Sequence, residues 1–210
     1  KVNTMEVAWL GPLDDTGQKI DLRVVIDGKT TSYNSISLKR GSNQLGQKGF
    51  NGLPSKSFDS LSSFFKSYLN LDISPALGKY NELYVNDARE ATKEVVKVVV
   101  SKLAKTNEKK LKAMLINSFN TGAFGNDNIT IFDIQKGSRM NPANVSSVIN
   151  KFKGIKIQDT SKTLGEMRFS GTHQGVEMEI AKIRFKFENE GKTKRIYFES
   201  SSAIKKLFKL

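Results

Sequence analysis

The sequence predicts an α+β protein whose helices lie mainly in the first half and whose strands dominate the last third. Two strand-forming segments within 21–39 flank an Asp27-Gly28 turn, which is a typical hairpin signal. Residues 87–105 begin with acidic residues, end with basic ones and carry a run of valines, as a buried helix does. Residues 178–187 alternate apolar and charged side chains, which is typical of a strand with one buried face.

The remaining elements are predicted from spacing and turn residues. In the first half they are a helix end or short strand at 5–10, a polar Gly-rich loop at 41–56, and helices at 57–69 and 108–119. In the second half they are a strand at 128–134, a short helix at 144–152, a strand from 195 after a turn at 189–192, and a basic helix at 202–210.

The length of the chain limits the number of domains that it can form. A chain of 210 residues fits one domain or one domain with a subdomain, since domains run to roughly 100–200 residues. We predict a core of hairpin and helices over 1–125 and a β-rich basic part over 126–210, which belongs either to the same domain or to a subdomain.

The absence of cysteine excludes disulfides, Cys-ligated metals and cysteine nucleophiles, and the single His173 excludes a multi-histidine metal site.

The charge indicates the class of partner. Lys and Arg number 34 against 21 Asp and Glu, so the net charge is +13 and the pI about 9.8, above the value of roughly 9 that flags nucleic-acid binding. We expect DNA as the partner, and the same charge also suits RNA. No run approaches the roughly 20 apolar residues of a membrane span, so we expect no membrane. A soluble protein that is merely basic is the alternative.

Two sets of cations form the predicted phosphate-binding surface. In the strand at 178–187 the basic side chains share one face, because residues two apart on a strand point the same way. With the following turn, this set is Lys182, Arg184, Lys186, Lys194 and Arg195. The loop set among glycines is Arg40, Lys48 and Lys56. A solvated strand face and an ordinary surface loop are the alternatives.

One cluster near the first hairpin carries reactive side chains. Ser37 and Lys39 share a face of the second hairpin strand, and Asp21 opens the adjacent strand. A carboxylate there helps to hold Mg²⁺ or Mn²⁺, and the metal lowers the pKa of a bound water. The lysine positions that water or stabilises charge on a phosphate. In the alternative interpretation Asp21 only starts a strand and Lys39 is a solvated charge at a strand end.

This pattern resembles the PD-(D/E)XK nuclease superfamily, which includes many restriction and phage endonucleases. The resemblance implies a mixed β-sheet flanked by helices, a restriction-endonuclease-like core, with Asp21 as the metal-binding aspartate and Lys39 as the catalytic lysine. Ser37 stands where a second carboxylate is expected, and no proline precedes Asp21. The resemblance covers about residues 6–47.

Three further residues enter through this resemblance. The Ser-Leu-Lys-Arg-Gly segment that starts at Ser37 and is followed by Gln44 resembles phage-type members in particular. Gln44 then supports the site or contacts DNA. If Ser37 does not bind metal, the site is weak, recruits Asp15 or Glu6 as the missing acid, or is inactive.

The sequence thus favours a Mg²⁺-dependent DNA endonuclease that hydrolyses phosphodiester bonds and carries a basic β-hairpin subdomain. The alternative is a non-catalytic nucleic-acid-binding or phage packaging protein with the same basic surface. Duplex cleavage implies either a homodimer with two active sites or sequential nicking. No apolar signal-peptide core opens the chain, so we expect the cytoplasm of a bacterial or phage-infected cell. The start at Lys1-Val2 suggests a fragment or a processed product.

Overall fold

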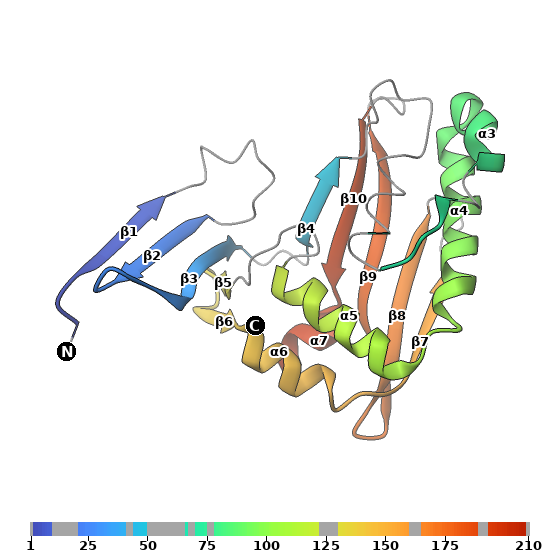
Figure 1. Ribbon diagram of the computed structural model, residues 1–210. Coiled ribbons are helices and arrows are strands. Elements are labelled where there is room, and N and C mark those ends of the chain that lie inside the picture. The colour runs from blue at the N-terminus through green and yellow to red at the C-terminus, as the bar shows by residue number, and fades with distance from the viewer. Residues whose placement is uncertain are drawn as a thin grey trace.

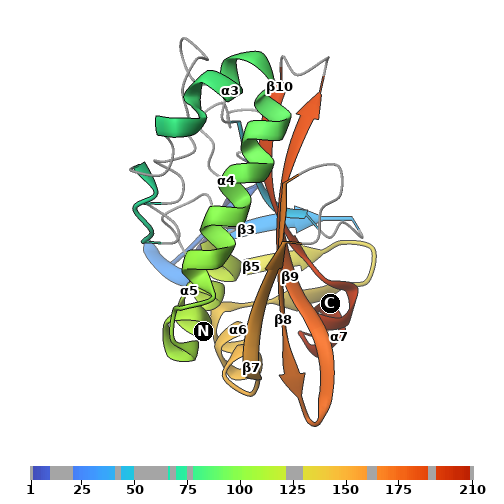
Figure 2. The same cartoon turned by 90° about the vertical axis from the view of Figure 1, so that its right-hand side faces the viewer.

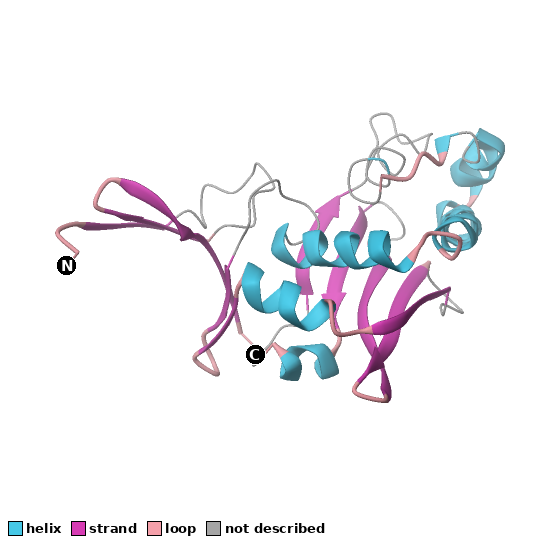
Figure 3. Ribbon diagram, turned by 60° about the horizontal axis from the view of Figure 1, so that its bottom comes forward, coloured by secondary structure: helices cyan, strands magenta, loops and turns pink. Residues whose placement is uncertain are grey.

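The described residues of the computed structural model form an α+β fold with two five-stranded sheets (Figure 1). The first sheet is mixed and has the order β1-β2-β3-β5-β6, and the second is antiparallel with the order β4-β10-β9-β8-β7. Helices α5, α6 and α7 lie between the two sheets (Figure 3). The structure describes residues 2–9, 21–40, 44–49, 66, 70–74, 78–121, 130–159, 165–188 and 193–208.

The elements have the following bounds. The first sheet contains β1 (Met5–Trp9), β2 (Leu22–Ile26), β3 (Lys29–Lys39), β5 (Thr130–Asp133) and β6 (Ser138–Met140). The second sheet contains β4 (Gln44–Gly49), β7 (Lys153–Asp159), β8 (Glu166–His173), β9 (Val176–Glu188) and β10 (Thr193–Ser200). The helices are the 3-10 turn η2 (Gly78–Tyr80), α3 (Asn81–Asn86), α4 (Ala88–Leu103), α5 (Glu108–Thr121), α6 (Pro142–Ile149) and α7 (Ser202–Leu207).

The β2–β3 hairpin forms at the predicted turn. Asp27 and Gly28 have φ angles of 48° and 68°, the left-handed values that a two-residue type I′ turn requires. The Asp27 carboxylate also accepts hydrogen bonds from the backbone N–H groups of Asn3 and Thr4, which ties the start of the chain to the hairpin. The segment predicted as a helix end or a strand at 5–10 is therefore strand β1.

The mixed character of the first sheet comes from one parallel pair. Strand β3 runs parallel to β5, with Lys39 in register with Asp133, and every other pair in this sheet is antiparallel. Between β3 and β5 the chain contributes β4 to the other sheet and then forms α3, α4 and α5. Strands from both 1–125 and 126–210 contribute to each sheet.

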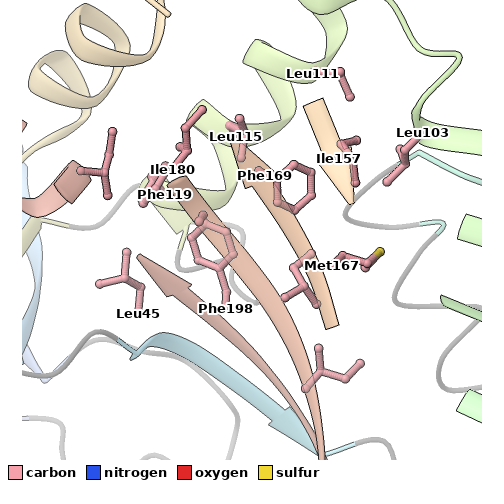
Figure 4. Packing of buried hydrophobic residues seen from close by; sticks show 14 of the residues in the cluster. Leu45, Leu103, Leu111, Leu115, Phe119, Ile157, Met167, Phe169, Ile180 and Phe198 are labelled. Atoms are coloured by element: carbon pink, nitrogen blue, oxygen red, sulfur yellow. The ribbon is translucent and has the colours of Figure 1, made fainter. Parts of the chain in front are cut away.

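The hydrophobic core lies between the second sheet and helices α4 and α5 (Figures 1 and 2). Helix α4 contacts β7 and β8, and α5 contacts β7. Asp87 caps α4 by accepting hydrogen bonds from the N–H groups of Arg89 and Glu90. At the other end of the core, Phe119 of α5 is fully buried. Its ring packs edge-on against Phe198 and Phe208, with ring centroids 5.1 Å away in both cases. Figure 4 shows Phe119 and Phe198 among the buried side chains of this core.

The prediction of a loop over 41–56 is wrong for residues 44–49, which form strand β4 along the free edge of β10. Glycine and glutamine lower the local strand propensity, but the edge of β10 offers this segment backbone hydrogen-bond partners, with one irregularity between Phe198 and Glu199. A partner about 150 residues away in the chain leaves no trace in the local pattern. The predicted helix at 57–69 lies outside the described residues except for Lys66, which is helical.

Gly165 provides a test of this packing. A Cβ atom at Gly165 would lie 2.8 Å from Cγ2 of Val96 and 3.2 Å from Cδ2 of Phe185. We therefore expect Gly165→Ala to lower the free energy of unfolding by about 1–3 kcal/mol, measured by urea denaturation. Adding Val96→Ala to the Gly165→Ala variant should relieve part of the local strain, because it removes the Cγ2 atom that the new Cβ would meet. Gly78→Ala is the control, because its Cβ would meet no atom within 4 Å. Equal stability of the two alanine variants would contradict the close packing.

Candidate active site

Asp21 is held against the end of β3. It lies one residue before β2, opposite Ser37, and its backbone N–H donates a hydrogen bond of 2.8 Å to the carbonyl of Ile36. Its Oδ2 accepts hydrogen bonds from Ser37 Oγ at 3.1 Å and from the backbone N–H of Leu38 at 2.6 Å. The structure thus brings together Asp21 and Ser37, as the hairpin pattern predicts, and the Ser37 hydroxyl orients the carboxylate.

Lys39 lies on the same side of β3 as Ser37, two residues further on. Its side chain is half-buried. Burial lowers the pKa of the Lys39 ammonium below its ordinary value, and the nearby Asp21 carboxylate partly opposes that change. A lysine that is poorly solvated and close to a fixed carboxylate differs from an ordinary solvated charge at a strand end.

Asp133 is an acidic residue of this site that sequence reasoning missed. It ends β5 in register with Lys39, and paired residues on neighbouring strands project to the same face of a sheet. Only 2% of Asp133 is exposed. Its Oδ1 accepts hydrogen bonds from the N–H groups of Gln135 at 3.0 Å and Lys136 at 3.3 Å, whereas the buried Oδ2 accepts none from the described residues.

A buried lysine approaches Asp133 from α7. Lys205 is 6% exposed. Burial lowers the pKa of its ammonium, the Asp133 carboxylate opposes this, and the Lys136 ammonium adds to the lowering. The two acids therefore have different cationic neighbours. The Asp21 carboxylate opposes the lowering of the Lys39 pKa, and the Asp133 carboxylate opposes the lowering of the Lys205 pKa.

The other predicted metal ligands do not join this cluster. Glu6 is exposed on β1 and pairs with Val25, four residues along β2 from Asp21, which is roughly 13 Å at about 3.3 Å per residue. Asp15 lies outside the described residues. Gln44 belongs to β4 in the second sheet, in register with Glu199, and its side chain lies outside the described part. The described residues contain no group of three or more acidic or histidine side chains that could hold a metal ion.

The predicted basic face of β9 carries compensating carboxylates. Arg184 pairs with Glu199 at 2.5 Å, and Lys182 lies 3.6 Å from Glu199 and 3.7 Å from Glu166. Arg168 of β8 bridges to Glu166 and to Glu179 at 3.1 and 3.0 Å. These three cations and three carboxylates form a neutral network on neighbouring strands. Lys182 and Arg184 therefore serve chiefly to pair acids of the sheet, rather than presenting free charge to a phosphate.

The remaining predicted binding residues are placed as follows. Arg40 is exposed at the end of β3, and Arg195 is half-buried on β10. Lys56 and the side chains of Lys48, Lys186 and Lys194 lie outside the described part of the chain. His173 is buried against the Phe152 ring at 5.2 Å between ring centroids, which makes it a core residue.

Comparisons of the chain with protein-family models, with curated proteins and with solved structures find no match. The resemblance to the nuclease superfamily therefore rests on Asp21, Ser37 and Lys39 in the sequence alone. In the part of the chain that the structure describes, no helix is both long and apolar enough to cross a membrane.

Proposed function

We propose that the protein is a metal-dependent nuclease that hydrolyses phosphodiester bonds of DNA at the cluster of Asp21, Lys39 and Asp133. One observation carries the proposal. The hairpin holds the Asp21 carboxylate beside the partly desolvated Lys39, and the parallel strand β5 places a buried acid in register with that lysine. Desolvated charges gathered at one edge of a sheet are costly to folding, and such arrangements are concentrated at functional sites.

The donor atoms suit a hard divalent cation. Mg²⁺ is commonly held by one or two carboxylates, with water and substrate phosphate completing its shell. Asp133 offers a buried Oδ2 that accepts no hydrogen bond from the described residues, and Asp21 accepts its two hydrogen bonds on Oδ2 alone. Asp21 would therefore bind Mg²⁺ or Mn²⁺ directly. Asp133, which lies on the other side of β3, would hold a water ligand of the ion in place of the acid that is missing at Ser37. The ion would supply a bound water of lowered pKa and charge neutralisation.

The other side chains have distinct roles in this proposal. The Ser37 hydroxyl donates to Asp21 and fixes the direction of its carboxylate. The Lys39 ammonium donates a hydrogen bond to the attacking water or to a phosphate oxygen, where negative charge develops in the transition state. Because Lys39 is partly withdrawn from solvent, its charge acts more strongly on the phosphate than it would in water.

Supercoiled plasmid provides the direct test. We expect the wild type to nick or linearise plasmid with Mg²⁺ or Mn²⁺ and to leave it intact in EDTA, and Lys39→Ala to leave it intact in both. Lys93→Ala is the matched control, because Lys93 pairs with Glu90 on the surface of α4, outside the cluster. Cleavage that survives in Lys39→Ala and in Asp21→Ala would place the chemistry elsewhere or assign it to a contaminant.

A non-catalytic nucleic-acid-binding or phage packaging role is the second candidate. It is favoured by Ser37 at the position of the second acid and by Lys205, whose charge can balance Asp133 without a metal. In that case the protein retards plasmid in a gel without cutting it at any Mg²⁺ or Mn²⁺ concentration.

A further inference from the structure

A group of exposed lysines lies where α4 meets α5 and where α6 meets β7. Its members, which we call the corner lysines, are Lys105, Lys109, Lys110, Lys151 and Lys153. Among the residues that the structure describes, none of these five ammonium groups takes part in an ion pair. They contrast with Lys182 and Arg184, whose charges are compensated by glutamates.

Two segments that are distant in the sequence meet at this corner. Glu108, in the first turn of α5, accepts a hydrogen bond of 2.8 Å from the backbone N–H of Gly154. Lys112, one turn later, donates to the carbonyl of Asn150 at 3.4 Å. These contacts hold the start of α5 against residues 150–154, so the corner lysines of both segments belong to one surface.

The nearby carboxylates are already paired with other cations. Glu108 forms an ion pair with Lys112 at 2.8 Å, and Glu177 on β9 lies 3.5 Å from Lys156 on β7. The five corner lysines therefore contribute five positive charges that neither glutamate compensates. A rigid surface with several uncompensated cations favours a polyanion.

The composition of the corner favours a nucleic acid over a membrane. Surfaces that bind anionic membranes combine lysines with Trp, Phe or Leu that enter the lipid. Of the large apolar residues that are exposed in the described part of the chain, only Val176, at the β8–β9 turn, lies close to the corner. The others lie in residues 2–9 at the start of the chain, in α3 and at the residue after β5. Nucleic-acid backbones, in contrast, are bound chiefly by lysine and arginine, without sequence readout.

We propose that the corner lysines bind the phosphate backbone of a nucleic acid. This surface is separate from the Asp21 cluster, so its function does not depend on catalysis. It also differs from the β9 face that the sequence pattern favours, because there the cations are compensated.

Binding of a short fluorescent DNA duplex, measured by anisotropy in EDTA over roughly 50–200 mM salt, tests the proposal. The logarithm of the association constant falls as the logarithm of the salt concentration rises, and each neutralised phosphate contributes about −0.9 to this slope. The variant Lys109→Gln/Lys110→Gln/Lys153→Gln should therefore make the slope less negative by about three units. The control Lys93→Gln/Lys97→Gln/Lys182→Gln removes the same net charge from paired lysines. We expect it to change the slope by less than one unit.

Other outcomes decide against the proposal. An equal loss of slope in both triple variants would show that only net charge matters, and an unchanged slope in the corner variant would show a solvated surface. The variant Lys109→Arg/Lys110→Arg/Lys153→Arg keeps the charges and should keep the slope. If the corner variant Lys109→Gln/Lys110→Gln/Lys153→Gln loses binding to phosphatidylserine–phosphatidylcholine vesicles but keeps its binding to DNA, the corner would be assigned to a membrane. Because EDTA suppresses cleavage, failure of this test is distinguishable from failure of the nuclease proposal.

Discussion

Replacing Lys39 by methionine is expected to reduce DNA cleavage by roughly a hundredfold to a thousandfold while leaving the protein at least as stable as the wild type. The activity loss follows from the removal of a positioned charge at a site where negative charge develops, for which losses of that size are typical. Methionine has a similar length and no charge, so it fills the half-buried space of the side chain. Plasmid cleavage and urea denaturation of the same preparation measure the two effects.

The stability gain follows from the burial of Lys39. Burial lowers the pKa of the Lys39 ammonium below 10.5, so near neutral pH the folded state bears the cost of a poorly solvated charge. Between the lowered pKa and 10.5 the unfolded chain binds more protons, so the stability of the wild type rises with pH in that window. The advantage of Lys39→Met should therefore shrink as the pH rises toward 10.5.

The opposite result would identify a structural lysine. If Lys39→Met lowers the free energy of unfolding at neutral pH by several kcal/mol, the ammonium chiefly balances Asp21 and holds the strand end together. Cleavage by Lys39→Met at the wild-type rate would likewise remove Lys39 from the chemistry. Lys97→Met, at an exposed ion pair on α4, is the control and should change neither activity nor stability beyond about 0.5 kcal/mol.

The elements that could be predicted are those whose determinants are local. Asp27 and Gly28 specify the turn of the hairpin through their left-handed φ angles. Asp87 caps α4 because its carboxylate reaches the N–H groups of the next turn. The shared face of Ser37 and Lys39 follows from the period of two in a strand. In each case the residues that decide the geometry lie within a few positions of one another.

The features that could not be predicted depend on pairing between distant segments. Asp133 joins the cluster only because β5 pairs in parallel with β3, and its own segment indicates no more than a short strand. The cations of β9 are compensated by Glu166 and Glu199 on the flanking strands β8 and β10. The corner lysines become one surface only through the contact of Glu108 with Gly154. None of these partners is marked by spacing along the chain.

The role of Asp133 can be separated from that of Asp21 by measuring how cleavage depends on Mg²⁺. Asp21→Asn keeps an oxygen that can accept the hydrogen bonds of Ser37 and Leu38, and Asp133→Asn keeps one for Gln135 and Lys136. Each change removes one negative charge and little volume. Both variants should therefore fold, which circular dichroism and the melting temperature will show.

If both carboxylates hold the ion, each variant should raise the Mg²⁺ concentration for half-maximal cleavage by at least roughly tenfold, the lower end of losses seen on removing groups that merely orient metal ligands. High Mg²⁺ should then restore part of the activity. If Asp133 only stabilises the β5–β6 turn, Asp133→Asn should leave the Mg²⁺ dependence unchanged and Asp21→Asn alone should shift it. A shift in neither variant would mean that neither carboxylate binds the ion. Asp21 would then be a strand-end residue whose carboxylate serves only to accept the hydrogen bonds of Ser37 and Leu38.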